Sequence, residues 1–446
     1  MVARAQAVLP AENIVEAYAV NRPFCGDVEG RRKERPVPAP PPPAAVRRSF
    51  FRRLVGGLLR WRAELLAVWR SLASARRAAL RIMQEHRPVA LLVACDRVFG
   101  PELPLIKAAG EIGCMTLVVP FAISPKAANA LRARRPLHQA EAAPQRTLKR
   151  WIRRRHPSQV IDSPQGAVLR YTPVQTLVLS LMRMLPPNPW CMGGGHSDFV
   201  AVSGPADRDT RIRDGVPAEK IVVTGETSFD FLFEAAQGKE ALIAGIQQAY
   251  GLDVGKKRLL CCPPPLLEHH LTGAAEHWEH MHSLAGVLAE TGANVLMALH
   301  PRCDPADYRW MEDSANVRIL EESLRDSLPA ADIYVASAES STVRWAVLLG
   351  IPVVCLDFYS PFPHRLYDGF EGIVWVRDRA ELPAVLRRLL EDAAHYEAVR
   401  RAQLATARRI AVFDGQARRR LIGVIEAHTG PARAARRREE TACESC

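Results

Sequence analysis

The chain has 446 residues, of which 48% are hydrophobic and 24% are charged, and its formal net charge is +12. This length exceeds what one hydrophobic core normally supports, so we expect two domains with additional terminal segments. No apolar run reaches the roughly 18 residues of a membrane-spanning helix, which excludes that class from the prediction. The 10 cysteines are scattered, mostly in apolar stretches, and are expected to be reduced thiols.

The positive charge is concentrated near the N-terminus, where residues 1–95 carry 17 Lys and Arg against 7 Asp and Glu. This distribution argues against a nucleic-acid surface along the whole chain and favours an acidic partner of the N-terminal half. The first residues lack the apolar core of a signal peptide, because Glu12, Asn13 and Glu16 interrupt it. A cytoplasmic location is therefore expected.

Residues 1–46 are expected to be disordered, since the proline-rich run from Pro36 to Pro43 cannot build a core. From about residue 47 the pattern predicts a basic amphipathic helix, and its apolar residues recur at three- and four-residue steps: Phe51, Leu54, Leu58, Trp61, Leu65, Trp69 and Leu72. Two interpretations remain open. The helix, whole or broken at Gly56-Gly57, packs on the first sheet, or it lies in the interface of an anionic membrane as a peripheral anchor.

The first α/β domain, with this helix, is expected to span residues 47–250. Its predicted strands cover residues 89–94, 115–119, 199–202 and 221–223. A glycine run at residues 193–195 predicts a flexible turn, and His196 follows it. That histidine either faces the predicted cleft or is structural. The arginine-rich stretch 130–156 is expected to be a solvated face beside the cleft.

The second α/β domain is expected to span residues 251–430, followed by a basic tail at 431–446. Its predicted strands cover residues 258–262, 295–299, 331–336 and 353–356, and helices alternate with them. This alternation predicts parallel β-α-β units, which bind ligands at the carboxyl ends of their strands.

Polar side chains follow two of these strands. Arg302 follows the strand at 295–299, and the hydroxyl residues Ser340, Ser341 and Thr342 follow the strand at 331–336, where a helix begins. The first turn of a helix attracts phosphate through its free N–H groups, and hydroxyl and guanidinium donors strengthen that attraction. The sequence thus predicts a phosphate site here. The alternative is that one hydroxyl only caps the helix.

Five histidines lie just beyond the first strand of this domain: His269, His270, His277, His280 and His282. No cysteine or acid set accompanies them at metal-ligand spacing, so no metal site is predicted.

Several short motifs resemble the GT-B nucleotide-sugar enzymes, in particular bacterial surface-polysaccharide glycosyltransferases and the UDP-N-acetylglucosamine 2-epimerase group. The motifs are His300-Pro301-Arg302, Ser337 to Thr342 with Gly350-Ile351-Pro352, Ser197 to Gly204, Thr224-Gly225 with Asp230, and Phe413 to Ala417. The resemblance implies an α/β GT-B fold, in which two Rossmann-like domains face a cleft and the second domain binds the donor.

The activity implied by the resemblance is glycosyl transfer from a nucleotide sugar to a glycan or lipid-linked acceptor, with no metal and no cofactor beyond the substrate. A nucleotide-sugar 2-epimerase and a GT-B-like protein that binds without turnover are the alternatives. By the same resemblance, Asp96, Glu102 and His196 are the candidate catalytic residues. His300, His364 and Glu371 join Arg302 and the hydroxyl residues as donor-binding candidates. Where relatives often have His-Gly after the strand ending at Pro120, this chain has Phe121-Ala122.

Overall fold

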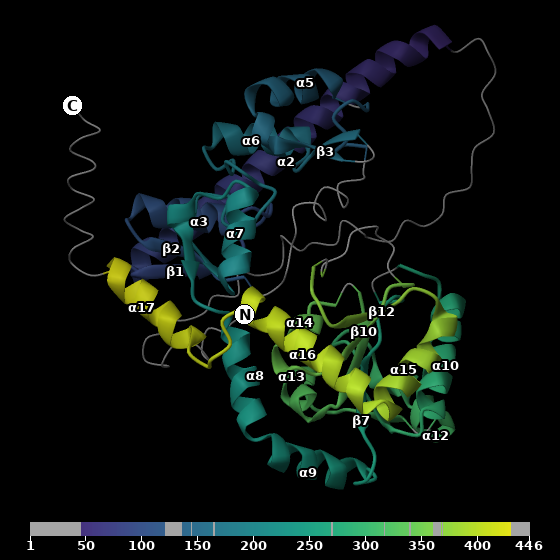
Figure 1. Ribbon diagram of the computed structural model, residues 1–446. Helices are drawn as coiled ribbons and strands as arrows, with labels where there is room; N and C mark the ends of the chain where they lie inside the picture. Colours follow the sequence, from purple (N-terminus) through teal and green to yellow (C-terminus); the bar gives the residue numbers. More distant parts are fainter. Residues whose placement is uncertain are drawn as a thin grey trace.

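The computed structural model in Figure 1 describes most of the chain in two α/β units. The described residues are 46–120, 136–143, 145–163, 166–268, 271–315, 317–338, 340–359, 367 and 369–429. The segments predicted to be disordered, 1–46 and 431–446, therefore lie outside them except for Val46, which begins α2.

The first unit is built on a parallel sheet with the strand order β1-β2-β5-β6. Its strands are β1 (Ala90–Val93), β2 (Met115–Val118), β5 (Phe199–Val202) and β6 (Ile221–Val223). Its helices are α2 (Val46–His86), α3 (Glu102–Glu111), α5 (Arg146–Arg155), α6 (Pro173–Leu181) and α7 (Pro205–Arg213). An antiparallel pair, β3 (Val160–Ser163) and β4 (Gly166–Leu169), stands apart from the sheet. The four predicted strands are confirmed within one to two residues.

The second unit contains a sheet of parallel strands in the order β12-β11-β10-β7-β8-β9. The strands are β7 (Arg258–Cys262), β8 (Asn294–Met297), β9 (Val317–Ile319), β10 (Ile333–Ser337), β11 (Val353–Leu356) and β12 (Ile373–Val376). Read from β9, this is the 3-2-1-4-5-6 order of a Rossmann fold. Every residue of β8, β10 and β11 is buried, as expected for strands covered by helices on both faces.

Helices cover both faces of this second sheet. They are α8 (Thr227–Gln237), α9 (Lys239–Tyr250), α10 (Ala274–Glu290), α11 (Pro305–Tyr308), α12 (Trp310–Ala315), α13 (Leu324–Ser327), α14 (Val343–Leu349), α15 (Leu382–Glu391) and α16 (Ala393–Ile410). Short 3₁₀ turns lie at Pro157–Gln159 and Ala218–Lys220 in the first unit and at Leu328–Ala330 and Arg379–Glu381 in the second. Side chains of α14 and α9 share one core with the sheet, and those of α10 and α15 share another.

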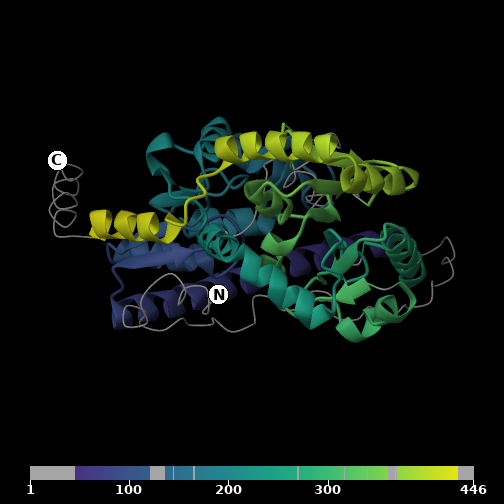
Figure 2. The same cartoon turned by 60° about the horizontal axis from the view of Figure 1, so that its bottom comes forward.

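The chain crosses between the two units twice. Phe229 of α8 and Ile246 of α9 are buried in the core of the second sheet. In contrast, Leu421 of the last helix, α17 (Ala417–Thr429), is buried against Met115 and Leu117 of the first sheet. Figure 2 shows α17 lying over the first sheet, well away from the second. By packing, therefore, α8 and α9 belong to the second unit and α17 to the first, which differs from the predicted boundaries at 250 and 430.

Helix α2 is continuous through Gly56-Gly57, and from Trp61 onward its apolar face is used inside the protein. Leu72 is fully buried with Val174 and Val178 of α6, and Ala79 packs on α3. This favours the interpretation in which the helix packs on the first unit. Leu66 and Trp69 of the same helix remain 46% and 42% exposed. None of the helices in the described part of the chain is long and apolar enough to cross a bilayer.

Candidate functional site

The strand order of the second sheet reverses between β7 and β10. At such a switch point the connections leave the two strands in opposite directions, which opens a crevice at their carboxyl ends where nucleotides bind. Strand β7 ends at Cys262 and β10 ends at Ser337, directly before the turn of Ser340, Ser341 and Thr342. The hydroxyl residues predicted from the sequence therefore stand at the carboxyl edge of the strand that borders the switch point.

The turn of Ser340 to Thr342 is organised by hydroxyl contacts. The Thr342 Oγ1 atom lies 2.6 Å from the Tyr334 hydroxyl and 2.6 Å from Ser340 Oγ, and the Tyr367 hydroxyl donates to the Ser340 carbonyl at 2.5 Å. Thr342 occupies the N-cap position of α14 but makes no side-chain capping bond. Simple capping by this residue is therefore not what the structure shows. Ser341 is exposed at the tip of the turn.

Tyr334 of β10, which is fully buried, and Cys262 of β7, which is half-buried, lie below this turn. Burial holds the pKa of the Tyr334 phenol well above its usual range, so Tyr334 stays neutral and keeps its proton for hydrogen bonding. Burial also raises the pKa of the neighbouring Cys262 thiol to about 11. Cys262 is thus a neutral thiol at neutral pH, and its side chain contacts Tyr334.

Arg302 and His300 follow β8 on the same carboxyl edge. The Arg302 backbone N–H donates to His300 Nδ1 at 3.2 Å, and the Arg302 side chain is exposed. Strand β7 separates β8 from β10, so the ends of β8 and β10 are about 10 Å apart at the usual strand spacing. Arg302 therefore follows a strand that ends at the same edge of the sheet as the hydroxyl turn.

Two donor-binding candidates remain, His364 and Glu371. His364 lies outside the described residues. Glu371 is exposed, and the hydrogen bonds of its backbone are both made with Thr406 of α16. Nothing in these contacts connects Glu371 to the hydroxyl turn.

Asp96 follows β1 and is fully buried. Its carboxylate accepts hydrogen bonds from Gly193 N at 3.0 Å, Gly195 N at 2.8 Å and Ser197 Oγ at 2.8 Å. This is the bonding of a carboxylate that holds a loop in place, since three donors occupy it and solvent does not reach it. The catalytic role of Asp96 stays a prediction, and the structure gives the residue a structural role as well.

His196 lies three residues before β5, whereas Ser203 and Gly204 follow the same strand. Because a strand rises about 3.3 Å per residue, His196 and these two residues stand at opposite ends of β5. The second unit contacts the Ser203 end, through Val412 N donating to the Ser203 carbonyl at 2.8 Å. The structure thus does not bring His196 together with the donor-binding candidates. Its Nε2 atom lies 2.9 Å from the Leu185 carbonyl.

Glu102 begins α3, the helix that follows β1, and its side chain is half-buried. It therefore lies at the carboxyl end of the first sheet, the same end as Ser203. Of the three catalytic candidates, Glu102 alone combines that position with access to solvent.

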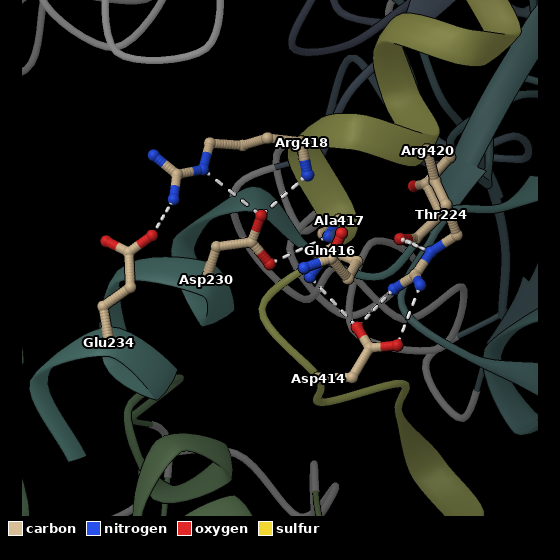
Figure 3. Close-up of polar contacts among 8 residues, drawn as sticks. All are labelled: Thr224, Asp230, Glu234, Asp414, Gln416, Ala417, Arg418 and Arg420. Atoms are coloured by element: carbon tan, nitrogen blue, oxygen red, sulfur yellow. Dashed lines mark hydrogen bonds and ion pairs between the residues drawn. The ribbon is translucent and has the colours of Figure 1, made fainter. Parts of the chain in front are cut away.

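The two segments that connect the units lie side by side and are joined by hydrogen bonds and ion pairs (Figure 3). Asp230 of α8 accepts hydrogen bonds from the backbone of Ala417 at 2.9 Å and of Arg418 at 2.7 Å, and so caps α17 from another helix. Arg420 donates to the Thr224 carbonyl at 2.8 Å and pairs with Asp414, and that pairing lowers the pKa of Asp414. The motifs Thr224-Gly225 with Asp230 and Phe413 to Ala417, far apart in sequence, are therefore one structural feature.

Sequence reasoning missed Arg344, in the first turn of α14. Its Nη2 atom donates to Ser203 Oγ at 2.6 Å, and the residue is 8% exposed. The sequence gives little signal for it, since Arg344 lies in an apolar helix and its partner is in the other unit. Within the described residues no group of three or more His, Cys, Asp or Glu side chains is placed to hold a metal ion.

A four-stranded parallel α/β unit and a second unit with Rossmann strand order meet at the carboxyl ends of their strands, and the last helix returns to the first unit. This is the arrangement expected from the resemblance to GT-B enzymes. No family model matches the chain. No curated protein matches it either.

Several solved structures align with the chain at low sequence identity. The wall teichoic acid polymerase TagF aligns at 13% identity over 71% of this chain and 68% of that chain, with a TM-score of 0.43. The UDP-GlcNAc 2-epimerase from Neisseria meningitidis, solved with bound UDP-GlcNAc, aligns at 13% identity over 80% and 81%, with a TM-score of 0.46. The UDP-GlcNAc 2-epimerase from Methanocaldococcus jannaschii aligns at 11% identity over 80% and 82%, with a TM-score of 0.44. Against TagF soaked with CDPG, the chain spans 57% of that protein's length.

Proposed function

We propose that this chain is a metal-independent glycosyltransferase that takes a sugar from a nucleotide-sugar donor. The observation that carries the proposal is the Rossmann switch point of the second sheet, with the hydroxyl turn of Ser340 to Thr342 at its carboxyl edge. A nucleotide diphosphate fits this arrangement because backbone and hydroxyl donors favour its phosphate oxygens. Arg302 approaches from β8 on the same edge and supplies charge to the far end of a long ligand.

The reaction would be a displacement at the anomeric carbon of the donor sugar. An acceptor hydroxyl attacks that carbon, the bond to the diphosphate breaks, and the diphosphate keeps the bonding electrons. Donors placed around the phosphate stabilise this developing charge. Glu102 is the best-placed residue to take the acceptor proton, since it stands at the carboxyl end of β1 with a reachable carboxyl group.

Turnover with a panel of nucleotide sugars tests the proposal. We expect free nucleotide diphosphate to appear only when a glycan or lipid-linked acceptor is present. Formation of an isomerised sugar nucleotide without acceptor would make the protein an epimerase. Binding with neither outcome would make it a GT-B-like binding protein. Addition of EDTA should leave transfer unchanged.

Replacing Arg302 by alanine should weaken nucleotide-sugar binding. Hydrogen bonds to charged groups contribute about 1.5–3 kcal/mol, so the loss of affinity should be roughly 10- to 150-fold. Ser341→Ala should cost less, because backbone donors of the turn survive. Titration calorimetry with UDP, CDP and GDP sugars measures both. Because the side chain of Arg302 is exposed, the Arg302→Ala variant should melt at the same temperature as the wild-type protein. Unchanged affinity in Arg302→Ala would remove this residue from the site.

The acceptor is proposed to be lipid-linked, reached from the cytoplasmic face of an anionic membrane. The support lies on α5, where Arg150, Arg154 and Arg155 are exposed beside Trp151, which is 40% exposed. Exposed arginines with an aromatic ring are typical of helices that bind anionic lipid headgroups.

Changing Arg150, Arg154 and Arg155 together to glutamine should therefore weaken binding to phosphatidylserine vesicles. Each arginine near such a surface contributes about 1 kcal/mol, so a loss of roughly 100-fold is expected, and it should shrink at high salt. Vesicle sedimentation measures it. The matched control changes three exposed arginines of the second unit, Arg387, Arg401 and Arg408. Equal loss in both variants would mean that net charge alone drives the binding. No binding by the parent would remove the membrane from the proposal.

A further inference from the structure

Arg344 is a buried guanidinium at the junction of the two units. It belongs to the first turn of α14, directly after the hydroxyl turn, and only 8% of its surface is exposed. Its Nη2 atom donates to Ser203 Oγ at 2.6 Å, across the junction, and its guanidinium lies 5.5 Å from the centre of the Phe229 ring. It is therefore held by a hydroxyl and an aromatic face.

No carboxylate among the described residues lies within ion-pair distance of Arg344, and its Nε atom is buried without a hydrogen-bond partner in that part of the chain. The nearest acid along its contacts is Asp207, which accepts from Ser203 Oγ at 3.4 Å. Asp207 also lies 3.3 Å from Arg211, so its charge is already engaged. A buried, uncompensated cation is costly, and proteins normally pair such a group with an anion.

We propose that Arg344 binds the diphosphate of the donor and that this anion supplies its missing counter-charge. The guanidinium suits this ligand, because its remaining N–H groups match the spacing of phosphate oxygens. Arg344 lies two residues beyond Thr342 in the chain, and the proposed function assigns the phosphates to the turn that ends at Thr342. The identity of the anion therefore rests on that proposed function. The contact with Ser203 makes Arg344 the point where the first unit meets the donor site.

Arg344→Met and Ser203→Ala form a matched pair that separates anion binding from a purely structural contact. Methionine keeps much of the volume and removes the charge, whereas Ser203→Ala removes the tie to the first unit and keeps the charge. The probes are inorganic pyrophosphate, UDP and CDP, titrated into the full chain by calorimetry. We expect Arg344→Met to weaken the binding of pyrophosphate, and of whichever nucleotide the parent binds, by roughly 10- to 100-fold. Ser203→Ala should change it by less than threefold.

The melting temperature without ligand gives a second, independent readout. Because the unpaired buried charge is unfavourable, Arg344→Met should melt at the same temperature as the parent or higher. Arg344→Lys should recover part of the affinity, since lysine keeps the charge but loses the fork of donors.

The outcomes distinguish this inference from the proposed function. If the parent binds UDP or CDP and Arg344→Met binds it equally well, the inference fails and the proposed function stands. If the parent and Arg344→Lys bind pyrophosphate but the parent binds neither nucleotide, the anion site stands and the proposed function fails. A Met variant that melts lower, with affinity lost equally in Ser203→Ala, would show that Arg344 acts as an interdomain tie and would overturn the inference.

Discussion

Replacing Asp96 by alanine is expected to destabilise the first unit severely. The side chain is fully buried, and its removal leaves the N–H groups of Gly193 and Gly195 and the hydroxyl of Ser197 without their acceptor. Each buried donor left unpaired costs about 1–3 kcal/mol, so the free energy of unfolding should fall by at least about 3 kcal/mol. The melting temperature should fall by roughly 6–12 °C, as calorimetry would record.

Glu102→Gln is the control, because that side chain is half-buried in the same unit. It should melt close to the parent temperature and lose transfer activity. The pair of variants also separates structural from catalytic carboxylates. An Asp96→Ala protein that is as stable as the parent but inactive would mean that Asp96 is catalytic and not structural.

Replacing Asp230 by alanine should release α17 from its cap. Asp230 is 1% exposed and accepts from two backbone N–H groups of α17 and from the Arg418 side chain. Loss of an N-cap costs about 1–2 kcal/mol, and burial of the released donors raises the total to roughly 2–4 kcal/mol. Hydrogen exchange should show faster exchange of the Ala417 and Arg418 amides.

Glu234→Ala is the matched control for this prediction. Glu234 also pairs with Arg418, but its side chain is 55% exposed. Exposed pairs contribute about 1 kcal/mol or less, so the exchange of α17 should hardly change. Equal exchange in both variants would mean that apolar packing of Leu421, and not the cap, holds α17 in place.

The strands of both sheets could be predicted from the sequence, because buried parallel strands are short apolar runs bounded by breakers. The hydroxyl turn could be predicted as well, since it follows a strand and opens a helix. Pairing between units is different. Asp230 and Arg418 are 188 residues apart, and no local pattern shows that an aspartate on one helix caps another.

The surroundings of three candidate site residues, His196, Asp96 and Glu371, could not be predicted from local sequence. His196 is close in sequence to β5, but sequence proximity does not say which end of the strand a residue occupies relative to the second unit. The resemblance makes Asp96 a catalytic candidate, and only the fold shows three donors converging on its carboxylate. Glu371 is held by Thr406, which is 35 residues away on a helix that covers the sheet.

The paired crossings also constrain how the two units can move. A single linker allows one domain to rotate about several axes relative to the other. Two adjacent linkers restrict the motion to rotation about one hinge axis. Here Gly225 lies so close to Val412 and Ala417 that an added Cβ would lie 3.1 Å from the Ala417 Cβ, so the two linkers are packed against each other. The two units should therefore open and close by rotation about one axis through the paired linkers. This rotation changes the distance between the hydroxyl turn of the second unit and Glu102 of the first.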